Sequence, residues 1–265
     1  MNTSTALSVD HWVDEHLRKN PYPGRVIVIG QNGAGEPTVV YGIMGRSSDS
    51  RDRGFIHDPA SPNDVVRTAT ASGRELPPEK AALVIYPAIA VKRLAGGRQA
   101  IFVTNGEQTQ GLLDNVGNED EFESVLSRYN YEPDKPNYTA RISGMIAVNE
   151  KGGWPKLTLS IITPDQNDET DPPRAIRRTF SDLEVKNGQG HMLTTYATDG
   201  NPLPAFQYGE PLPVPLFGGT EDIANFYWAA LNEDNRVALV VRTFGNDGSP
   251  RDMHIIHGRG TPIQG

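Results

Sequence analysis

The chain has 265 residues, enough for one large domain or two small ones, and 25 basic against 33 acidic side chains give it a formal net charge of -8. This acidic balance argues against nucleic acid as the main partner, because binding a phosphate backbone requires a broad basic face. The absence of cysteine excludes disulfides, thiolate nucleophiles and cysteine-ligated zinc, and it is compatible with a cytoplasmic location. No apolar run approaches the roughly 20 residues of a membrane span, and we expect no signal peptide in Met1–Asp10.

Three amphipathic helices are predicted. The first covers residues 8–19, with Ser8 as its N-cap and a short apolar stripe. The second opens at Asn118 with acidic residues, which the helix dipole favours near an N-terminus. The third opens at Thr220, and apolar side chains again recur at helical spacing after it.

Short runs rich in Val, Ile, Thr and aromatic residues dominate the rest of the chain and predict strands. Because these runs are grouped and do not alternate with helices, we expect an α+β fold with mostly antiparallel sheets. Two further stretches, Asp58–Lys80 and Pro164–Pro173, have the proline content or acidity of surface insertions. The predicted strands are Arg25–Gly30, Thr38–Met44, Ala82–Tyr86, Ala100–Thr104, Arg141–Val148, Leu157–Thr163, Ala175–Phe180, His191–Tyr196, Val237–Phe244 and Asp252–His257.

A cationic loop, Gly45–Arg53, follows the second predicted strand. It holds three arginines and three serines within nine residues of an acidic protein. Guanidinium groups bind phosphate in a bidentate way, and hydroxyls and loop amides can complete such a site. The loop is therefore either a site for one anionic group or a solvated turn whose Arg and Asp side chains pair among themselves.

Glycines and histidines indicate no cofactor or metal site. The run Gly30–Gly35 lacks the spacing of a dinucleotide-binding loop and is followed by a strand, so it predicts a hairpin turn. His254 and His257 lie three apart in a predicted strand and face opposite sides of it. We therefore expect neither a metal nor a nucleotide cofactor.

Other polar segments stand at the ends of predicted strands. Thr104–Gln110 clusters an amide, a carboxylate and a hydroxyl, and it is either a turn or an acid–base site. Asn137–Ile142 leads into a strand through an arginine. Thr194–Tyr196 and the later Phe206 belong either to a pocket wall or to core and turn.

The order of these segments resembles the archaeal-type IMP cyclohydrolases, which also occur in some bacteria. The resemblance runs from about Gly24 to about Ala230. It rests on these residues in this order: Gly24-Arg25, Gly35-Glu36-Pro37, Tyr41, Arg46-Ser47-Ser48, Arg51, Thr104-Asn105-Gly106, Thr109, Tyr131-Glu132 and Thr139-x-Arg141-Ile142.

The resemblance implies a four-layer αββα sandwich of the N-terminal-nucleophile-hydrolase type. It also implies homo-oligomers and cofactor-independent closure of the purine ring, in which formamidoimidazole carboxamide ribonucleotide loses water to give IMP. The chain departs from the family pattern by its two insertions, by Gln108 and Gln110 in place of His and Asp, and by 23 residues before Gly24. We therefore expect an N-terminal helical extension, residues 1–23, and a single catalytic domain, residues 24–265.

Roles for the site residues follow from the resemblance as hypotheses. Arg46 contacts the reacting centre or the carboxamide, Tyr41 orients the carboxamide, and Glu107 transfers the proton. The remaining assignments are the 5′-phosphate for Ser47, Ser48 and Arg51, the base or ribose for Asn105 and Thr109, substrate binding for Thr139, and the phosphate or a carboxylate for Arg141; Arg53 is expected to remain a surface charge.

Two alternatives stay open. The first is a nucleotide-binding protein that has kept the pocket without the chemistry. The second is an amide hydrolase of the N-terminal-nucleophile type, which needs Ser, Thr or Cys as its first mature residue, whereas Gly24-Arg25 opens the first strand here.

Overall fold

Two β-sheets form the centre of the molecule in a computed structural model that describes residues 9–149, 151, 153–206 and 209–258. Within these residues, every pairing between neighbouring strands is antiparallel. The six-stranded sheet has the order β11 (Leu212–Pro215), β10 (Gln189–Thr194), β1 (Arg25–Gln31), β2 (Pro37–Met44), β12 (Arg236–Phe244), β13 (Pro250–His257). The seven-stranded sheet has the order β3 (Gly54–Asp58), β4 (Val65–Ala69), β5 (Pro87–Leu94), β6 (Arg98–Thr104), β7 (Arg141–Asn149), β8 (Lys156–Pro164), β9 (Ala175–Phe180).

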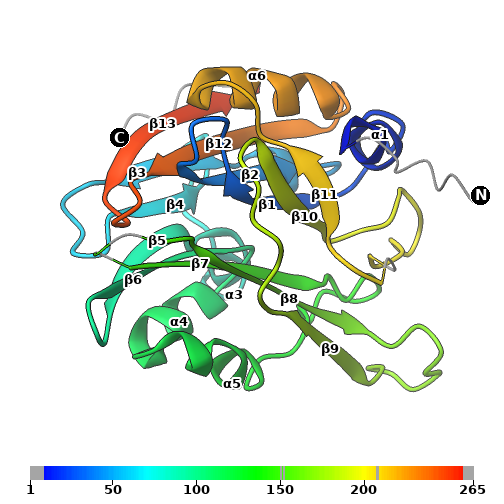
Figure 1. The fold of residues 1–265 in the computed structure, drawn as a ribbon. Helices are drawn as coiled ribbons and strands as arrows, with labels where there is room; N and C mark the ends of the chain where they lie inside the picture. Colours follow the sequence, from blue (N-terminus) through cyan, green and yellow to red (C-terminus); the bar gives the residue numbers. More distant parts are fainter. Residues whose placement is uncertain (1–8, 150, 152, 207–208, 259–265) are drawn as a thin grey trace, which may run out of the picture.

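Helices cover the outer face of each sheet (Figure 1). Above the six-stranded sheet lie α1 (Val9–Val13), its π-helical continuation η1 (Asp14–Arg18) and α6 (Thr220–Ala230). Below the seven-stranded sheet lie α4 (Gln108–Asn115), η2 (Glu119–Glu121) and α5 (Phe122–Leu126). The predicted α+β class with mostly antiparallel sheets is confirmed, and no helix among the described residues is long and apolar enough to cross a membrane.

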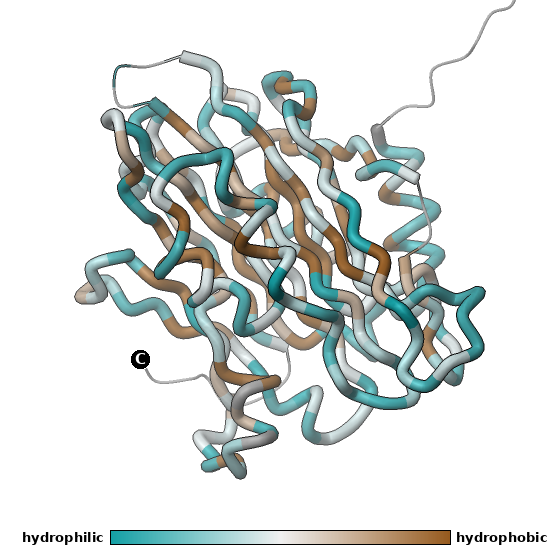
Figure 2. The backbone as a smooth tube through the Cα atoms, turned by 90° about the horizontal axis from the view of Figure 1, so that it is seen from below, coloured by the Kyte–Doolittle hydropathy of each residue, from teal (hydrophilic) through white to brown (hydrophobic). Residues whose placement is uncertain are grey.

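The main core lies between the two sheets and under α6. Every residue of β1 and β2 is buried, because both faces of these strands are covered. Figure 2 shows the hydrophobic strands inside and the hydrophilic loops around them. The sheets approach closely at Gly144, where a Cβ atom would lie 3.0 Å from Ile29 of the opposite sheet. A second core under α4 and α5 contains the stacked rings of Phe102 and Phe122.

Most predicted elements are confirmed, with bounds that shift by a few residues. The hairpin turn between β1 and β2 occupies the Gly30–Gly35 region as expected, and α6 begins at the predicted Thr220. The first helix is present as α1 and η1, although its predicted cap Ser8 lies outside the described residues. The acidic second helix is shorter than expected, consisting of η2 and α5.

Two predictions about the middle of the chain were wrong. Ala82–Tyr86 is not a strand, because α3 (Pro78–Val84) runs into it with proline at its first position. Asp58–Lys80 is not simply a surface insertion, since β4 lies within it and pairs with β3 and β5. The Thr104–Gln110 segment begins with the turn that was one of its two interpretations, and α4 starts within it at Gln108.

Candidate active site between the sheets

Two adjacent strands of the six-stranded sheet direct polar side chains toward the other sheet. Tyr41 of β2 is directly opposite Ile27 of β1, and Arg25 and Ile29 share a face with Ile27 because side chains alternate along a strand. Ile29 packs against Gly144 of the seven-stranded sheet. Arg25 and Tyr41 therefore enter the space between the sheets, and both are buried.

Tyr86 joins this group from the opposite sheet. It directly precedes β5, and its hydroxyl oxygen lies 2.7 Å from that of Tyr41. Both side chains are buried, so this hydrogen bond replaces the water that each hydroxyl loses. Burial raises the pKa of Tyr41 well above its ordinary value, which keeps the hydroxyl protonated as a hydrogen-bond donor.

Arg25 and Arg53 bring two positive charges into the same space. Nε of Arg25 and both Nε and Nη1 of Arg53 are inaccessible to solvent and have no hydrogen-bond partner among the described residues. Burial and the nearby charge of Arg25 lower the pKa of Arg53. Two like charges with unused N–H groups are costly to bury, and a bound anion would relieve that cost. The expectation that Arg53 remains a surface charge was wrong.

Glu132 supplies the acidic group of the cluster. Its exposed fraction is 4 %, and burial raises its pKa to about 7, although Arg25 and Arg141 oppose the rise. The segment is fixed by a backbone hydrogen bond of 2.8 Å from Glu132 to Thr139. A carboxyl group with such a pKa exchanges its proton near neutral pH, as proton-transfer groups in enzymes do. We call Arg25, Tyr41, Arg53, Tyr86 and Glu132 the inter-sheet cluster.

A stack of aromatic rings lies beside the cluster. The rings of Tyr22 and Tyr196 are 5.9 Å apart and nearly parallel, and the guanidinium of Arg46 lies 4.8 Å from the centre of the Tyr22 ring. Arg46 also forms an ion pair with Asp199, and its side chain is 37 % exposed. The hydroxyl of Thr139 hydrogen-bonds to that of Tyr196. The structure thus places Arg46 and Thr139 in this stack, with Arg46 at its exposed end.

The serines of the cationic loop stabilise a short helix. The loop contains α2 (Ser48–Arg51), and the Ser47 hydroxyl caps it by accepting a hydrogen bond from the amide of Ser50. Ser47, Ser48 and Arg51 are exposed. Of the three arginines in this loop, only Arg53 reaches the inter-sheet cluster.

The remaining predicted site residues gather around the start of α4. Met145 of β7 packs in the core under α4 and α5. Arg141 lies four residues before it in the same strand, so its side chain is on the same face and points toward these helices. Arg141 pairs there with Glu107, whose side chain is 57 % exposed, at 2.8 Å. Thr109 shares a hydrogen bond with Thr104. The structure does not bring these side chains into the inter-sheet cluster, although the positive charge of Arg141 lowers the pKa of Glu132 and so opposes the effect of burial.

The side chain of Asn105 hydrogen-bonds to backbone groups. Its amide nitrogen donates to the carbonyl of Ala140 and its oxygen accepts from the amide of Ile142, both at 2.8 Å. The same oxygen accepts from Gln108 at 3.2 Å. Asn105 is fully buried, so these bonds fix the start of β7 against the end of β6.

Sequence reasoning gave no role to four members of the inter-sheet cluster, namely Arg25, Arg53, Tyr86 and Glu132. Gly24-Arg25 and Tyr131-Glu132 do appear in the ordered pattern of short motifs described above. Their presence there is the signal that could have marked Arg25 and Glu132 as site residues. Tyr86 carries no such signal.

The chain belongs to the family of IMP cyclohydrolase-like proteins, whose model matches residues 22–248. The matched range includes all five residues of the inter-sheet cluster. The searches among curated proteins and among solved structures gave no match.

Proposed function

We propose that this protein is an IMP cyclohydrolase that converts 5-formamidoimidazole-4-carboxamide ribonucleotide into IMP. The carboxamide nitrogen attacks the formyl carbon of the same molecule, a C–N bond forms, and the formyl oxygen leaves as water. Membership of the IMP cyclohydrolase-like family supports this reaction class. We further propose that residues 24–265 form one catalytic domain of the N-terminal-nucleophile-hydrolase type.

The observation that carries the proposal is the pair of arginines beside Glu132, the buried Arg25 and the half-buried Arg53. Their unpartnered N–H groups would stabilise the oxyanion that develops on the formyl oxygen, where one well-placed donor is worth about 3–4 kcal/mol. A phosphate dianion would fit this position less well, because the Glu132 carboxylate lies close to the same arginines. We therefore assign the reacting end of the substrate, and not its phosphate, to the inter-sheet cluster.

Glu132 is proposed as the proton-transfer group. Deprotonated, it would accept a proton from the attacking carboxamide; protonated, it would donate one to the departing oxygen. A pKa of about 7 allows both states at neutral pH. The hydroxyls of Tyr41 and Tyr86 would hold the carboxamide in the attacking rotamer, since orientation lowers the barrier of such intramolecular reactions.

The test is direct conversion by the purified protein. The formylated ribonucleotide is added and IMP formation is followed by ultraviolet absorbance. We expect turnover, and a loss of about 100-fold or more in the Arg53→Met variant. The exposed Arg67→Met variant is the matched control and should retain full activity. Binding of IMP without any turnover would instead identify a non-catalytic nucleotide-binding protein.

A further inference from the structure

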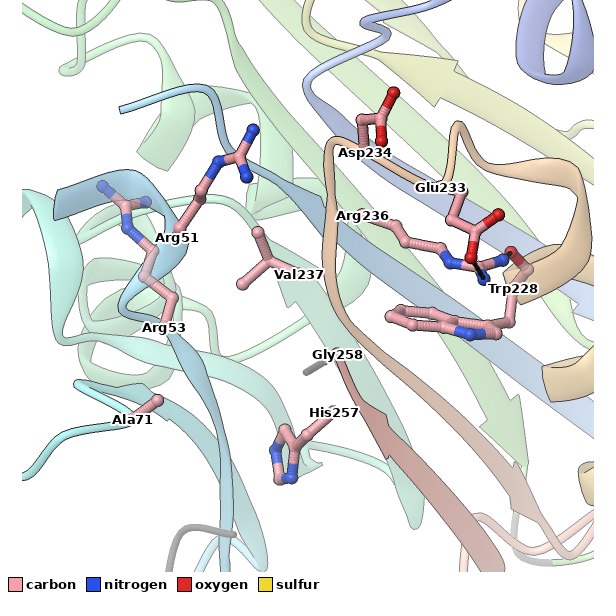
Figure 3. Close-up of a pocket in the computed structure, with 10 residues that line it drawn as sticks. All are labelled: Arg51, Arg53, Ala71, Trp228, Glu233, Asp234, Arg236, Val237, His257 and Gly258. Atoms are coloured by element: carbon pink, nitrogen blue, oxygen red, sulfur yellow. Dashed lines mark hydrogen bonds and ion pairs between the residues drawn. The ribbon is translucent and has the colours of Figure 1, made fainter. Parts of the chain in front are cut away.

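A pocket lies beside the inter-sheet cluster, and both Arg51 and Arg53 are among its lining residues. It has a volume of about 460 Å³, within the range of small-molecule sites. Figure 3 shows Arg51 and Arg53 on one side and Trp228, Glu233 and Arg236 on the other, with His257 beneath. Arg53 lines this pocket, and its guanidinium points away from the tryptophan side, so this residue connects the pocket with the inter-sheet cluster.

The wall formed by the end of α6 and the start of β12 is aromatic and acidic. The Arg236 guanidinium lies 4.7 Å from the centre of the Trp228 ring and donates to the Trp228 carbonyl at 2.8 Å, which fixes the indole in the wall. Glu233 is 3.8 Å from Arg236, and its side chain is 75 % exposed. An indole accepts flat aromatic rings by stacking, and an ionised carboxylate accepts hydrogen bonds only. This wall therefore favours a planar group with a donor edge.

The opposite wall donates hydrogen bonds. Arg51 is exposed, and its guanidinium has no ion-pair or hydrogen-bond partner among the described residues. His257 accepts a hydrogen bond from the amide of Phe55 on Nε2 at 3.1 Å, and burial lowers its pKa. Its neutral ring therefore carries the proton on Nδ1, which is a donor. This side of the pocket favours an anionic group.

We propose that this pocket, which adjoins the inter-sheet cluster at Arg53, is a binding site for a guanine nucleotide. The guanine ring stacks on Trp228, its N1–H and 2-amino groups donate to Glu233, and its phosphate binds Arg51. Guanine offers two adjacent donors to a carboxylate. Hypoxanthine lacks the 2-amino group, and adenine lacks it too and has an acceptor nitrogen at N1 in place of the N1–H donor. The site therefore prefers GMP to IMP and IMP to AMP.

The test is titration calorimetry of the full-length protein with GMP, IMP and AMP. We expect GMP to bind most tightly. Trp228→Ala should weaken GMP binding by about tenfold or more, as loss of a stacking partner does for nucleotides. The control Trp154→Ala removes an indole that is 72 % exposed elsewhere on the molecule, and it should leave GMP affinity unchanged.

Two exposed positions keep the test decisive if Trp228→Ala fails to fold. Arg51→Gln should weaken all three nucleotides, whereas Glu233→Gln should reduce the preference for GMP over AMP. Glu75→Gln, at another exposed carboxylate, is the control for the latter. Absence of GMP binding at millimolar concentration would overturn the proposal, as would GMP binding that is indifferent to all three pocket variants. IMP is also the product of the proposed reaction, so binding of IMP alone does not test this pocket. The loss of GMP affinity in the pocket variants does, and that measurement requires no turnover.

Discussion

The hydroxyl groups of Tyr41 and Tyr86 meet at 2.7 Å across the interface between the two sheets. One tyrosine belongs to β2 and the other directly precedes β5, so this bond joins the two halves of the sandwich at the inter-sheet cluster. Both hydroxyls are buried, which makes each of them dependent on the other as a partner.

Removing either hydroxyl should therefore destabilise the protein. Tyr41→Phe and Tyr86→Phe are each expected to lower the free energy of unfolding by about 1–2 kcal/mol, because each leaves one buried hydroxyl unsatisfied. The double variant should cost less than the sum, with a coupling energy of about 1 kcal/mol. Urea denaturation of the unchanged protein, the two single variants and the double variant measures this double-mutant cycle. Additive effects would show that the bond contributes nothing to stability.

The raised pKa of Glu132 predicts a particular pH dependence of stability. Its pKa is about 7 in the folded protein against an ordinary 4.5, so the folded state retains a proton that the unfolded state releases between these values. The free energy of unfolding should therefore fall as pH rises from 4.5 through 7, by at most about 3 kcal/mol. Glu132→Gln should lack this fall and be relatively more stable at alkaline pH.

Denaturation at a series of pH values tests the effect of Glu132. The exposed Glu123→Gln serves as the control and should follow the pH profile of the unchanged protein. If Glu132→Gln gave the same profile as the control, the burial of an ionisable carboxyl at this position would be excluded as the source of the pH dependence.

Asn105 should matter for stability. Asn105→Ala removes three side-chain hydrogen bonds and leaves the carbonyl of Ala140 and the amide of Ile142 without partners. We expect a loss of about 2–4 kcal/mol in the free energy of unfolding, measured by chemical denaturation. Asn225→Ala, at an exposed position in α6, should be neutral or slightly stabilising, because alanine is the better helix former. Equal effects at the two positions would contradict the structural role of Asn105.

Arg46 and Arg53 should differ in their effects on turnover. Arg46 lies at the exposed end of the tyrosine stack and pairs with Asp199, whereas Arg53 is part of the inter-sheet cluster. Arg46→Ala should reduce turnover by roughly tenfold or less, the scale of an exposed cation–π contact. Arg53→Met should be far more damaging. Steady-state kinetics of both variants show which substitution reduces turnover more. A larger loss in Arg46→Ala would show that Arg46, and not Arg53, is the more important residue for the reaction.

The fold was more predictable than the site because its signals are local. The β1 and β2 strands follow from continuous runs of Val and Ile bounded by Gly and Pro. The misassigned Ala82–Tyr86 run shows the limit of that reasoning: a short apolar run fits a strand or a buried helix end equally well. Here the preceding prolines at 77 and 78 start the helix.

The site was harder to predict because its members converge from distant segments. Arg25, Arg53, Tyr86 and Glu132 come from four separate parts of the chain, and no local pattern says which of three nearby arginines turns inward. Arg46 and Arg51 have the same residue type as Arg53 and the same loop, but remain at the surface. Only the packing of the loop against β3 and the opposite sheet selects Arg53.

The division of the inter-sheet cluster between the two sheets has a consequence for assembly during folding. Arg25 and Tyr41 come from one sheet, while Tyr86 and Glu132 come from segments that lead into the other. A partly folded chain with a single completed sheet holds only part of the cluster and leaves its arginine in water. Ligand binding at this cluster would therefore appear only once the halves have docked, and its loss on denaturation would mark their separation.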